Sequence, residues 1–260
     1  MNVKLIRQPT VYLLGRQSLD PADLDRFLAD HDVAAWQTDT DVAGQKLCEV
    51  AGRVCYMSFA KPRPGGNETY LHHILEVGHG SVLEHAVWNF VVTGVSRTFT
   101  HELVRHRAGF GYSQLSQRYV DESVAEYVEP DCVADDPECH AIFQAAIAEA
   151  HASYLKLTDR LNQRFAQVED KTMRRKLARQ AARCVLPNAT ETKIFVTANA
   201  RALRHFIEAR CNEFAEPEIR KVAGEFLKIM QREAPALFGD YEWKPLPDGT
   251  RSAETPHRKV

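Results

Sequence analysis

The chain has 260 residues, enough for one large domain or two small ones with a sizeable hydrophobic core, and we favour a single domain over residues 1–240. Its formal net charge is −2, which argues against a general nucleic-acid protein and requires any basic site to be local. We see no signal peptide, no long apolar run and no CxxC pair among the six cysteines, so we expect a cytoplasmic protein with no membrane partner and with reduced thiols mostly in its core.

The first sixty residues have the pattern of a scaffold. Residues 3–14 predict two short strands separated by a proline, and the Asp-Pro pair at residues 20–21 predicts the capped start of a helix. Between residues 41 and 57 apolar side chains recur at helical spacing. Cys48 and Cys55 fall seven apart on one face of that helix, so we expect both in the core.

A predicted helix over residues 68–77 leads into a segment rich in histidine. Together they hold His72, His73, His79 and His85, with Glu76 and Glu84 nearby. Imidazoles and carboxylates ligate metals, so a metal-dependent nucleotide phosphohydrolase is one hypothesis. The spacing is not specific, because no HExxH pair fixes two imidazoles on one helical turn, and we expect no metal.

Residues 86–93 are rich in β-branched and aromatic side chains and are apolar at nearly every position. They predict a strand that is buried on both faces and ends at Gly94. A helix then begins, with Ser96 as its N-cap and with Phe99 and Leu103 four apart on its apolar face. This helix leads directly into a run of cations.

That run is Arg105, His106 and Arg107, and a turn with two glycines follows it. A series of hydroxyls and amides then closes on Arg118, and we expect these side chains on alternating sides of a short extended segment. Arginine offers a planar fork of donors that matches phosphoryl oxygens, while serine and glutamine complete the oxygen shell. The stretch therefore predicts a phosphate site, although an RNA-binding module that uses the same arginines is a further hypothesis. Basic residues at a helix end also complement its dipole, which accounts for only one or two of these cations.

The second half of the chain is mainly helical. Residues 131–140 read as an acidic loop, and helices are predicted over residues 141–165, 171–184, 199–210 and 217–233. We interpret the basic face of the second of these helices as solvated. The third helix follows a short strand at residues 193–197 and aligns Arg201, His205 and Glu208 in one polar stripe. Residues 241–260 show no apolar period, so we expect a tail.

Three ordered blocks between residues 78 and 219 resemble the flavin-dependent thymidylate synthases. In the first block, the Arg-His-Arg triplet is followed after eight residues by Ser116 and then by Arg118. The segment at residues 79–85 is similar to the family's His-Gly-Ser/Thr-x-x-Glu-His. Arg183 before Val-Leu-Pro, and the Asn-x-Arg at residues 199–201, match the family's later blocks.

The resemblance implies an α+β fold in which a small antiparallel or mixed sheet packs with long helices, and a homotetramer whose sites are assembled at subunit interfaces. It implies reductive methylation of dUMP to dTMP with FAD as cofactor, 5,10-methylenetetrahydrofolate as one-carbon donor and NADPH as reductant. The implied dUMP-binding residues are Glu102, Arg105, Gln114, Leu115, Ser116, Gln117, Arg118, Arg183 and Arg210. The implied FAD-binding residues are Ser81, Arg105, His106, Arg107, Gln114, Asn199, Arg201 and His205, with His79 on the folate and flavin side.

Arg210 is the implied catalytic residue. Uracil C5 is a poor nucleophile, and a guanidinium fixed against the ring carbonyl would stabilise the enolate-like charge that forms as C5 reacts. The family is thought to need no cysteine or serine attack on the ring. This agrees with a chain whose cysteines lie in apolar helices with no evident Cys-His arrangement.

Two positions depart from the family's pattern. Glu102 stands where glutamine is frequent, and Phe214 stands where many members have a histidine whose hydrogen bond a phenyl ring cannot replace. Both departures concern residues that bear on which nucleotide is bound, so a paralogue that modifies another pyrimidine nucleotide is an alternative.

Overall fold

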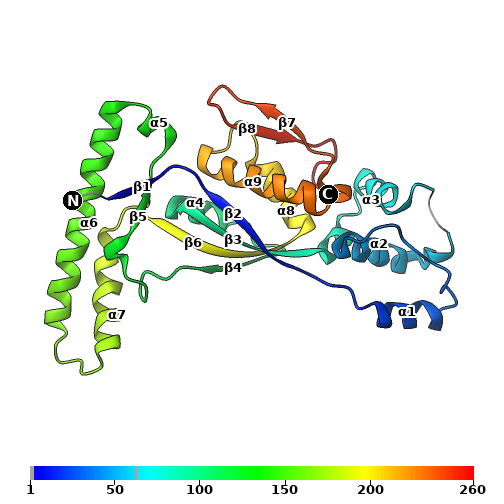
Figure 1. The fold of residues 1–260 in the computed structure, drawn as a ribbon, viewed down its shortest axis with the longest axis horizontal. Coiled ribbons are helices and arrows are strands. Elements are labelled where there is room, and N and C mark those ends of the chain that lie inside the picture. The colour runs from blue at the N-terminus through cyan, green and yellow to red at the C-terminus, as the bar shows by residue number, and fades with distance from the viewer. Residues whose placement is uncertain (1–2, 62–63) are drawn as a thin grey trace. The chain divides into compact units, whose positions relative to one another are not determined.

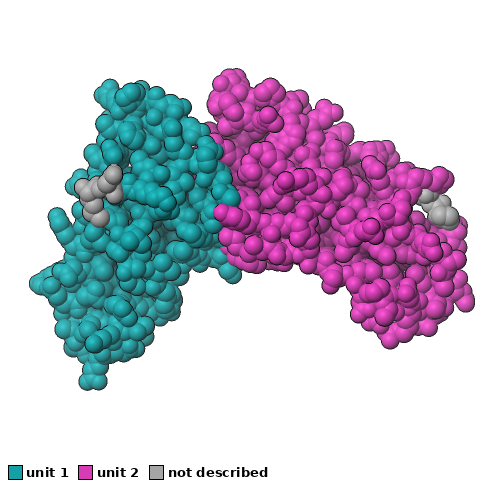
Figure 2. Space-filling view, in the orientation of Figure 1, with its two compact units in different colours: residues 1–10, 92–104, 113–194 teal, residues 11–91, 105–112, 195–260 magenta. Residues whose placement is uncertain are grey.

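The computed structural model describes residues 3–61 and 64–260, and its chain divides into two compact units. Unit 1 holds residues up to 10, 92–104 and 113–194, and unit 2 holds residues 11–91, 105–112 and 195–260 (Figure 2). Long helices combined with small sheets confirm the predicted α+β class. No helix in the described ranges has both the length and the apolar character needed to cross a bilayer.

One four-stranded sheet contains strands that each contribute residues to both units. Its order is β2 (Thr10–Arg16), β3 (Val87–Ser96), β6 (Glu191–Asn199) and β4 (Phe110–Gln114). The prediction that β3 is buried on both faces is wrong, because buried Trp88, Phe90 and Val92 alternate with half-buried neighbours. The strand also runs through Gly94, whose N–H donates to Glu191 Oε1 over 3.0 Å.

Unit 1 is dominated by two long helices that lie side by side (Figure 1). Its elements are β1 (Lys4–Ile6), α4 (Arg97–Leu103), η3 (Glu122–Val124), β5 (Glu126–Val128), α5 (Asp131–Ala134), α6 (Pro137–Arg164), α7 (Lys171–Ala182) and η4 (Arg183–Val185). β1 and β5 pair in parallel, and Val3, Tyr127 and Ile147 form the core beneath them. The acidic stretch predicted as a loop is largely helical, since Asp136 caps α6 by accepting from the N–H groups of residues 138 and 139.

Unit 2 is built mainly from helices. They are α1 (Pro21–Asp30), α2 (Ala43–Tyr56), η1 (Ser58–Ala60), α3 (Gly66–Glu76), η2 (Gly80–His85), α8 (Ala200–Arg210), α9 (Pro217–Glu233) and α10 (Pro235–Phe238). Asp20 caps α1 as predicted, accepting from Asp23 N over 3.1 Å. The rings of Phe90, Phe206 and Phe226 pack edge to face where α8 and α9 meet the sheet.

Residues 241–260, expected to be a tail, are folded. β7 (Glu242–Pro245) and β8 (Arg251–Glu254) pair as an antiparallel hairpin. Ala253 is buried, and Trp243 Nε1 donates to Gln231 Oε1 of α9 over 3.0 Å. The hairpin therefore belongs to the packed body of unit 2.

All six cysteines are free thiols, but only Cys48 and Cys211 are buried. The prediction that the thiols lie mostly in the core is therefore wrong. Cys55, expected beside Cys48, is exposed in the last turn of α2, where Val54 and Tyr56 are exposed as well. Helical spacing identifies one face of a helix but not how far along that face the packing extends.

Candidate active site

The residues implied by the resemblance divide between the two units. The cofactor cluster, defined as the implied residues in unit 2, comprises His79, Ser81, Arg105, His106, Arg107, Asn199, Arg201, His205 and Arg210. The nucleotide cluster, defined as those in unit 1, comprises Glu102, Gln114, Leu115, Ser116, Gln117, Arg118 and Arg183.

The start of α8 holds the cofactor cluster together. Asn199 is the N-cap, and its Oδ1 accepts from Ala202 N over 2.8 Å. Its own N–H donates to the carbonyl of Gly109 over 3.1 Å, which ties the turn after the cationic triplet to the helix N-terminus. Gly109 has φ +74°, and a Cβ there would lie 2.7 Å from Asn199 Nδ2 and 2.8 Å from the Ala202 Cβ. Only glycine fits this junction.

His106 lies at the centre of the cluster. Arg210 Nε, from the last turn of α8, donates to His106 Nε2 over 3.1 Å. The imidazole also packs against the rings of His205 and Phe206, at centroid distances of 5.8 and 5.1 Å. Tyr112 Oη donates to the His106 carbonyl over 2.6 Å, and burial raises the pKa of Tyr112, so this hydroxyl remains a donor at neutral pH. Both ends of α8 thus contact the triplet stretch.

Arg201 stands in the first turn of α8, where the helix dipole disfavours a cation. Its Nη1 lies 2.6 Å from Glu84 Oε1, and its Nε would be 2.8 Å from a Cβ added to Gly80. Its side chain is 44% exposed, so solvent and ligands can reach the guanidinium. A helix N-terminus that also carries an accessible arginine suits a doubly charged group such as the diphosphate of FAD. In these respects the residues present fit that cofactor.

The nucleotide cluster begins where β4 ends. Gln114 Nε2 donates to Thr100 Oγ1 over 3.0 Å and to Thr192 Oγ1 over 3.3 Å, and both threonines are buried. Leu115 continues beside β6, its N–H donating to the Lys193 carbonyl over 2.8 Å. The amide of Gln114 is therefore held in one orientation before any ligand arrives.

A turn at residues 116–119 gathers the polar side chains that follow. Ser116 Oγ accepts from Arg118 N over 3.3 Å, and the Ser116 carbonyl accepts from Tyr119 N over 3.2 Å. The prediction that these side chains alternate along an extended segment is wrong beyond Gln114. The hydrogen bonds of Ser116 to its own following backbone explain the difference, since serine favours such turns.

Buried donors without partners mark this turn. Gln117 is 5% exposed, and neither its Nε2 nor the buried Arg118 Nε finds an acceptor among the residues that the structure describes. A buried polar group left unpaired costs about 1–3 kcal/mol, so two adjacent ones call for a ligand that accepts hydrogen bonds.

Arg97, the first residue of α4, was not singled out from the sequence. Its Nη1 is buried and has no partner among the described residues. Burial lowers the pKa of Arg97, and the nearby charge of Arg183 lowers it further, while that of Glu122 opposes the shift. A cation immediately after the N-cap serine, against the helix dipole, was the available signal. Arg97 and Arg183 thus place two positive charges close together in unit 1.

The basic face of α7 was predicted to be solvated, but one of its arginines is largely buried. Arg179 donates to the Tyr119 carbonyl over 2.9 Å and to Asp121 Oδ2 over 2.6 Å, and its side chain is only 16% exposed. Lys176 Nζ lies over the ring of Tyr119, 4.7 Å from its centroid. The helix therefore anchors the C-terminal side of the turn at residues 116–119.

A family model described as "Thymidylate synthase complementing protein" matches residues 38–236. The chain belongs to this family. A flavin-dependent thymidylate synthase of Mycolicibacterium gilvum is 53% identical over 232 residues, spanning 88% of this chain and 92% of that protein. Its counterpart in Mycobacterium tuberculosis is 51% identical over 232 residues, which again span 88% of this chain and 92% of that protein. The crystal structure of the UMP/dUMP methylase PolB from Streptomyces cacaoi, bound with 5-Br UMP, matches in fold with a TM-score of 0.63 at 20% identity, covering 92% of this chain and 96% of that one.

The range matched by the thymidylate synthase complementing family contains every residue of both clusters and stops before β7. The hydrolase hypothesis gains no support from the geometry. His72 and His73 both lie near Glu76, at 3.2 and 3.5 Å, and no group of three His, Cys, Asp or Glu side chains suited to a metal occurs in the described part of the chain.

Proposed function

We propose that this member of the thymidylate synthase complementing family methylates dUMP to dTMP reductively, using FAD, 5,10-methylenetetrahydrofolate and NADPH. Family membership supports the reaction, and the relatives named above carry the name flavin-dependent thymidylate synthase. Within the structure, the observation that carries the proposal is the pair of buried, unpaired donors Gln117 Nε2 and Arg118 Nε. A nucleotide phosphate supplies the acceptor oxygens that these donors need.

Nucleotide binding is assigned to the nucleotide cluster together with Arg105 and Arg210. Ser116, Gln117 and Arg118 hold the phosphate, because they share one turn and include the unpaired donors. Arg183 and Arg97 add positive charge, and Arg97 bears a further unpaired Nη1. Gln114, already oriented by two threonines, presents its amide to the substrate or to the flavin. Glu102 lies half-buried on α4.

FAD binding is assigned to Ser81, Arg105, His106, Arg107, Gln114, Asn199, Arg201 and His205, with His79 on the folate and flavin side. Arg201 and the N-terminus of α8 would hold the negative charge of its diphosphate. When bound and reduced, FAD supplies the hydride that converts the transferred one-carbon unit to a methyl group.

Arg210 is assigned the catalytic role. Its bond to His106 Nε2, in a cluster braced by Tyr112, fixes the direction of the guanidinium before substrate binds. A positioned cation of this kind stabilises negative charge on the uracil ring as C5 reacts, without reorganising. The buried thiols are not available as nucleophiles, because burial raises the pKa of Cys48 to about 12 and that of Cys211 to about 11.

Assembly as a homotetramer in the cytoplasm completes the proposal. Tyr12 and Leu14 are 50% and 60% exposed on β2, and Phe195 of β6 is 38% exposed. A second copy that covered these side chains would remove their apolar surface from water, which favours association. Free thiols at all six cysteines suit a reducing compartment.

A second candidate is the same chemistry on another pyrimidine nucleotide. Phe214 follows Arg210 by four residues and is 90% exposed, so this position cannot supply the side-chain hydrogen bond of a histidine. PolB, which shares the fold, is itself described as a UMP/dUMP methylase.

Tritium release from 5-labelled dUMP, with NADPH and methylenetetrahydrofolate present, tests the proposal. We expect tritium release from labelled dUMP that requires NADPH, methylenetetrahydrofolate and FAD. Release from labelled UMP at an equal or higher rate would favour the second candidate, and absence of release from either nucleotide by protein that contains FAD would refute both.

A further inference from the structure

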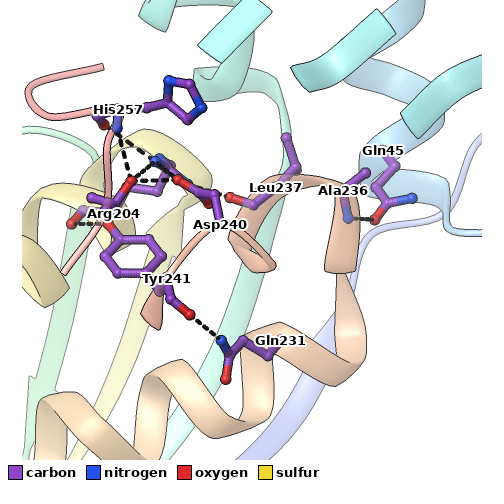
Figure 3. A network of polar contacts seen from close by, with 9 residues as sticks. Gln45, Arg204, Gln231, Ala236, Leu237, Asp240, Tyr241 and His257 are labelled. Carbon is purple, nitrogen blue, oxygen red and sulfur yellow. Dashed lines mark hydrogen bonds and ion pairs between the residues drawn. The ribbon is translucent and has the colours of Figure 1, made fainter. Parts of the chain in front are cut away.

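Residues 255–260 pack back onto α8 through several polar contacts. Arg204 Nη2 donates to Thr255 Oγ1 over 3.3 Å. It also donates to the His257 carbonyl over 3.3 Å (Figure 3). One turn further along the helix, Glu208 accepts from Lys259 N over 3.0 Å and from Arg258 Nε over 3.2 Å. We call residues 255–260 the latch.

The latch reaches the cofactor cluster. A Cβ added to Gly80 would lie 2.7 Å from the Val260 carbonyl carbon and 2.8 Å from Arg201 Nε, so all three residues meet at one point. Val260 is only 7% exposed. The ring of His257 also stands edge-on to His72 of α3, with centroids 5.2 Å apart. The latch therefore joins α8, α3 and η2, and its end lies against an arginine assigned to FAD.

The anchor of the latch is rigid. Arg204 is buried and forms a bidentate pair with Asp240, with Nη1–Oδ1 and Nη2–Oδ2 distances of 2.7 and 2.8 Å. Thr255 Oγ1 also donates to Asp240. By contrast, Arg201 is 44% exposed, and within the described residues its ion-pair partner is Glu84. A long exposed side chain of this kind loses conformational freedom when it binds a ligand, unless its surroundings already order it.

We propose that the latch is a positioning element for FAD, which holds Arg201 against Gly80 in the orientation that binds the cofactor. The inference rests on the proposed function, because it takes Arg201 as an FAD ligand. Without the latch, Glu84 would be the one ion-pair partner left to orient Arg201 in the described part of the chain. Ordering one such side chain corresponds to roughly a three- to tenfold change in affinity.

Two variants test this. One chain stops after Thr255, which removes residues 256–260 but keeps the bond to Asp240, and the other carries Glu208→Ala, which removes the acceptor for Lys259 and Arg258. Lys244→Ala is the matched control, because it breaks the exposed pair with Glu254, 2.5 Å apart, in the hairpin that leads into the latch. FAD affinity is measured by quenching of flavin fluorescence, and dUMP affinity by calorimetry at saturating FAD.

We expect the FAD dissociation constant to rise three- to tenfold in both latch variants and to stay within twofold in the control, with dUMP affinity within twofold throughout. An unchanged FAD affinity in the latch variants overturns the inference. Tighter FAD binding also overturns it, since the latch would then compete with the cofactor. Should the shortened chain fail to fold, Glu208→Ala decides alone. If the unaltered protein and the Lys244→Ala control both fail to bind FAD, the proposed function is refuted instead. That outcome differs from failure of the inference, in which all the proteins bind FAD with equal affinity.

Discussion

Asp240→Asn tests whether the buried ion pair at the base of the latch stabilises the fold. The side chains of Arg204 and Asp240 are 2% and 8% exposed and share two short hydrogen bonds. Arg204 Nε is already buried without a partner in residues 3–61 and 64–260, so this part of the chain offers no spare acceptor to replace the carboxylate. Removing one member of a buried pair leaves the other charge uncompensated, which typically costs about 3–5 kcal/mol.

We expect Asp240→Asn to lie at the lower end of that range, about 3 kcal/mol, because the amide oxygen still accepts one bond and the Leu237 carbonyl still accepts from Arg204 Nη1 over 2.6 Å. For a chain of this size, that loss lowers the melting temperature by roughly 6–12 °C. Chemical denaturation and calorimetry measure both quantities. Glu254→Gln is the control, because its exposed pair with Lys244 should be worth under about 1 kcal/mol.

The pH dependence gives a second, independent check. Burial by itself raises the pKa of Asp240, but the hydrogen bonds and charge of Arg204 outweigh burial and lower that pKa below its usual value. A carboxyl group with a lowered pKa in the folded state adds stability above its unfolded pKa of about 3.9, and this stability is lost as the pH falls through the folded pKa. The stability difference between the unaltered protein and Asp240→Asn should therefore be full at pH 7 and shrink below about pH 4. A loss under 1 kcal/mol at pH 7, or a difference that grows in acid, contradicts the reasoning.

Three further substitutions separate the assigned roles. Gly109→Ala should cost about 1–3 kcal/mol of stability and weaken FAD binding. Gly249→Ala is the control, because that glycine has a similar φ of +77° but open space around it, and it should leave FAD binding unchanged. Equal losses of FAD affinity in titrations of the two variants would contradict a specific role for Gly109. Arg210→Ala should leave FAD bound but lower turnover about 10²- to 10³-fold, and activity within a few-fold of the parent would refute its task in charge stabilisation. Ser116→Ala should weaken dUMP binding about tenfold and FAD binding much less, since one bond to a charged oxygen is lost; calorimetry that finds equal losses counts against the assignment.

Local rules were sufficient to predict most of the helices. Asp20 and Ser96 each accept from a backbone N–H at the start of the helix that they were expected to cap, and Asn199 does the same where a helix was expected to begin. These predictions hold because a cap and its helix are neighbours in the chain. The same is true of the triplet at residues 105–107, whose place just after α4 follows from the apolar period before it.

Features that depend on distant partners were not predictable in this way. The hairpin and latch look like a tail because their apolar residues have no period. They fold because the buried guanidinium of Arg204 on α8 donates to the latch and the indole of Trp243 in the hairpin donates to Gln231 on α9. Arg179 reads as solvated for the same reason, since its acceptors lie about sixty residues earlier in the chain. The sequence around a charged side chain does not show whether a carboxylate distant in the chain pairs with it.

Gly109 links the triplet at residues 105–107, which was recognisable from sequence, to α8, whose contact with the triplet was not. Its carbonyl accepts from Asn199 N, and its α-carbon leaves room for Asn199 and Ala202, so one glycine joins the turn after the triplet to the N-terminus of α8. At the other end of the same helix, Arg210 bonds back to His106. Two points of contact along one rigid helix fix the register between segments about ninety residues apart in the chain. The spacing within each block is therefore constrained by these contacts, and a motif read from sequence alone depends on such a constraint.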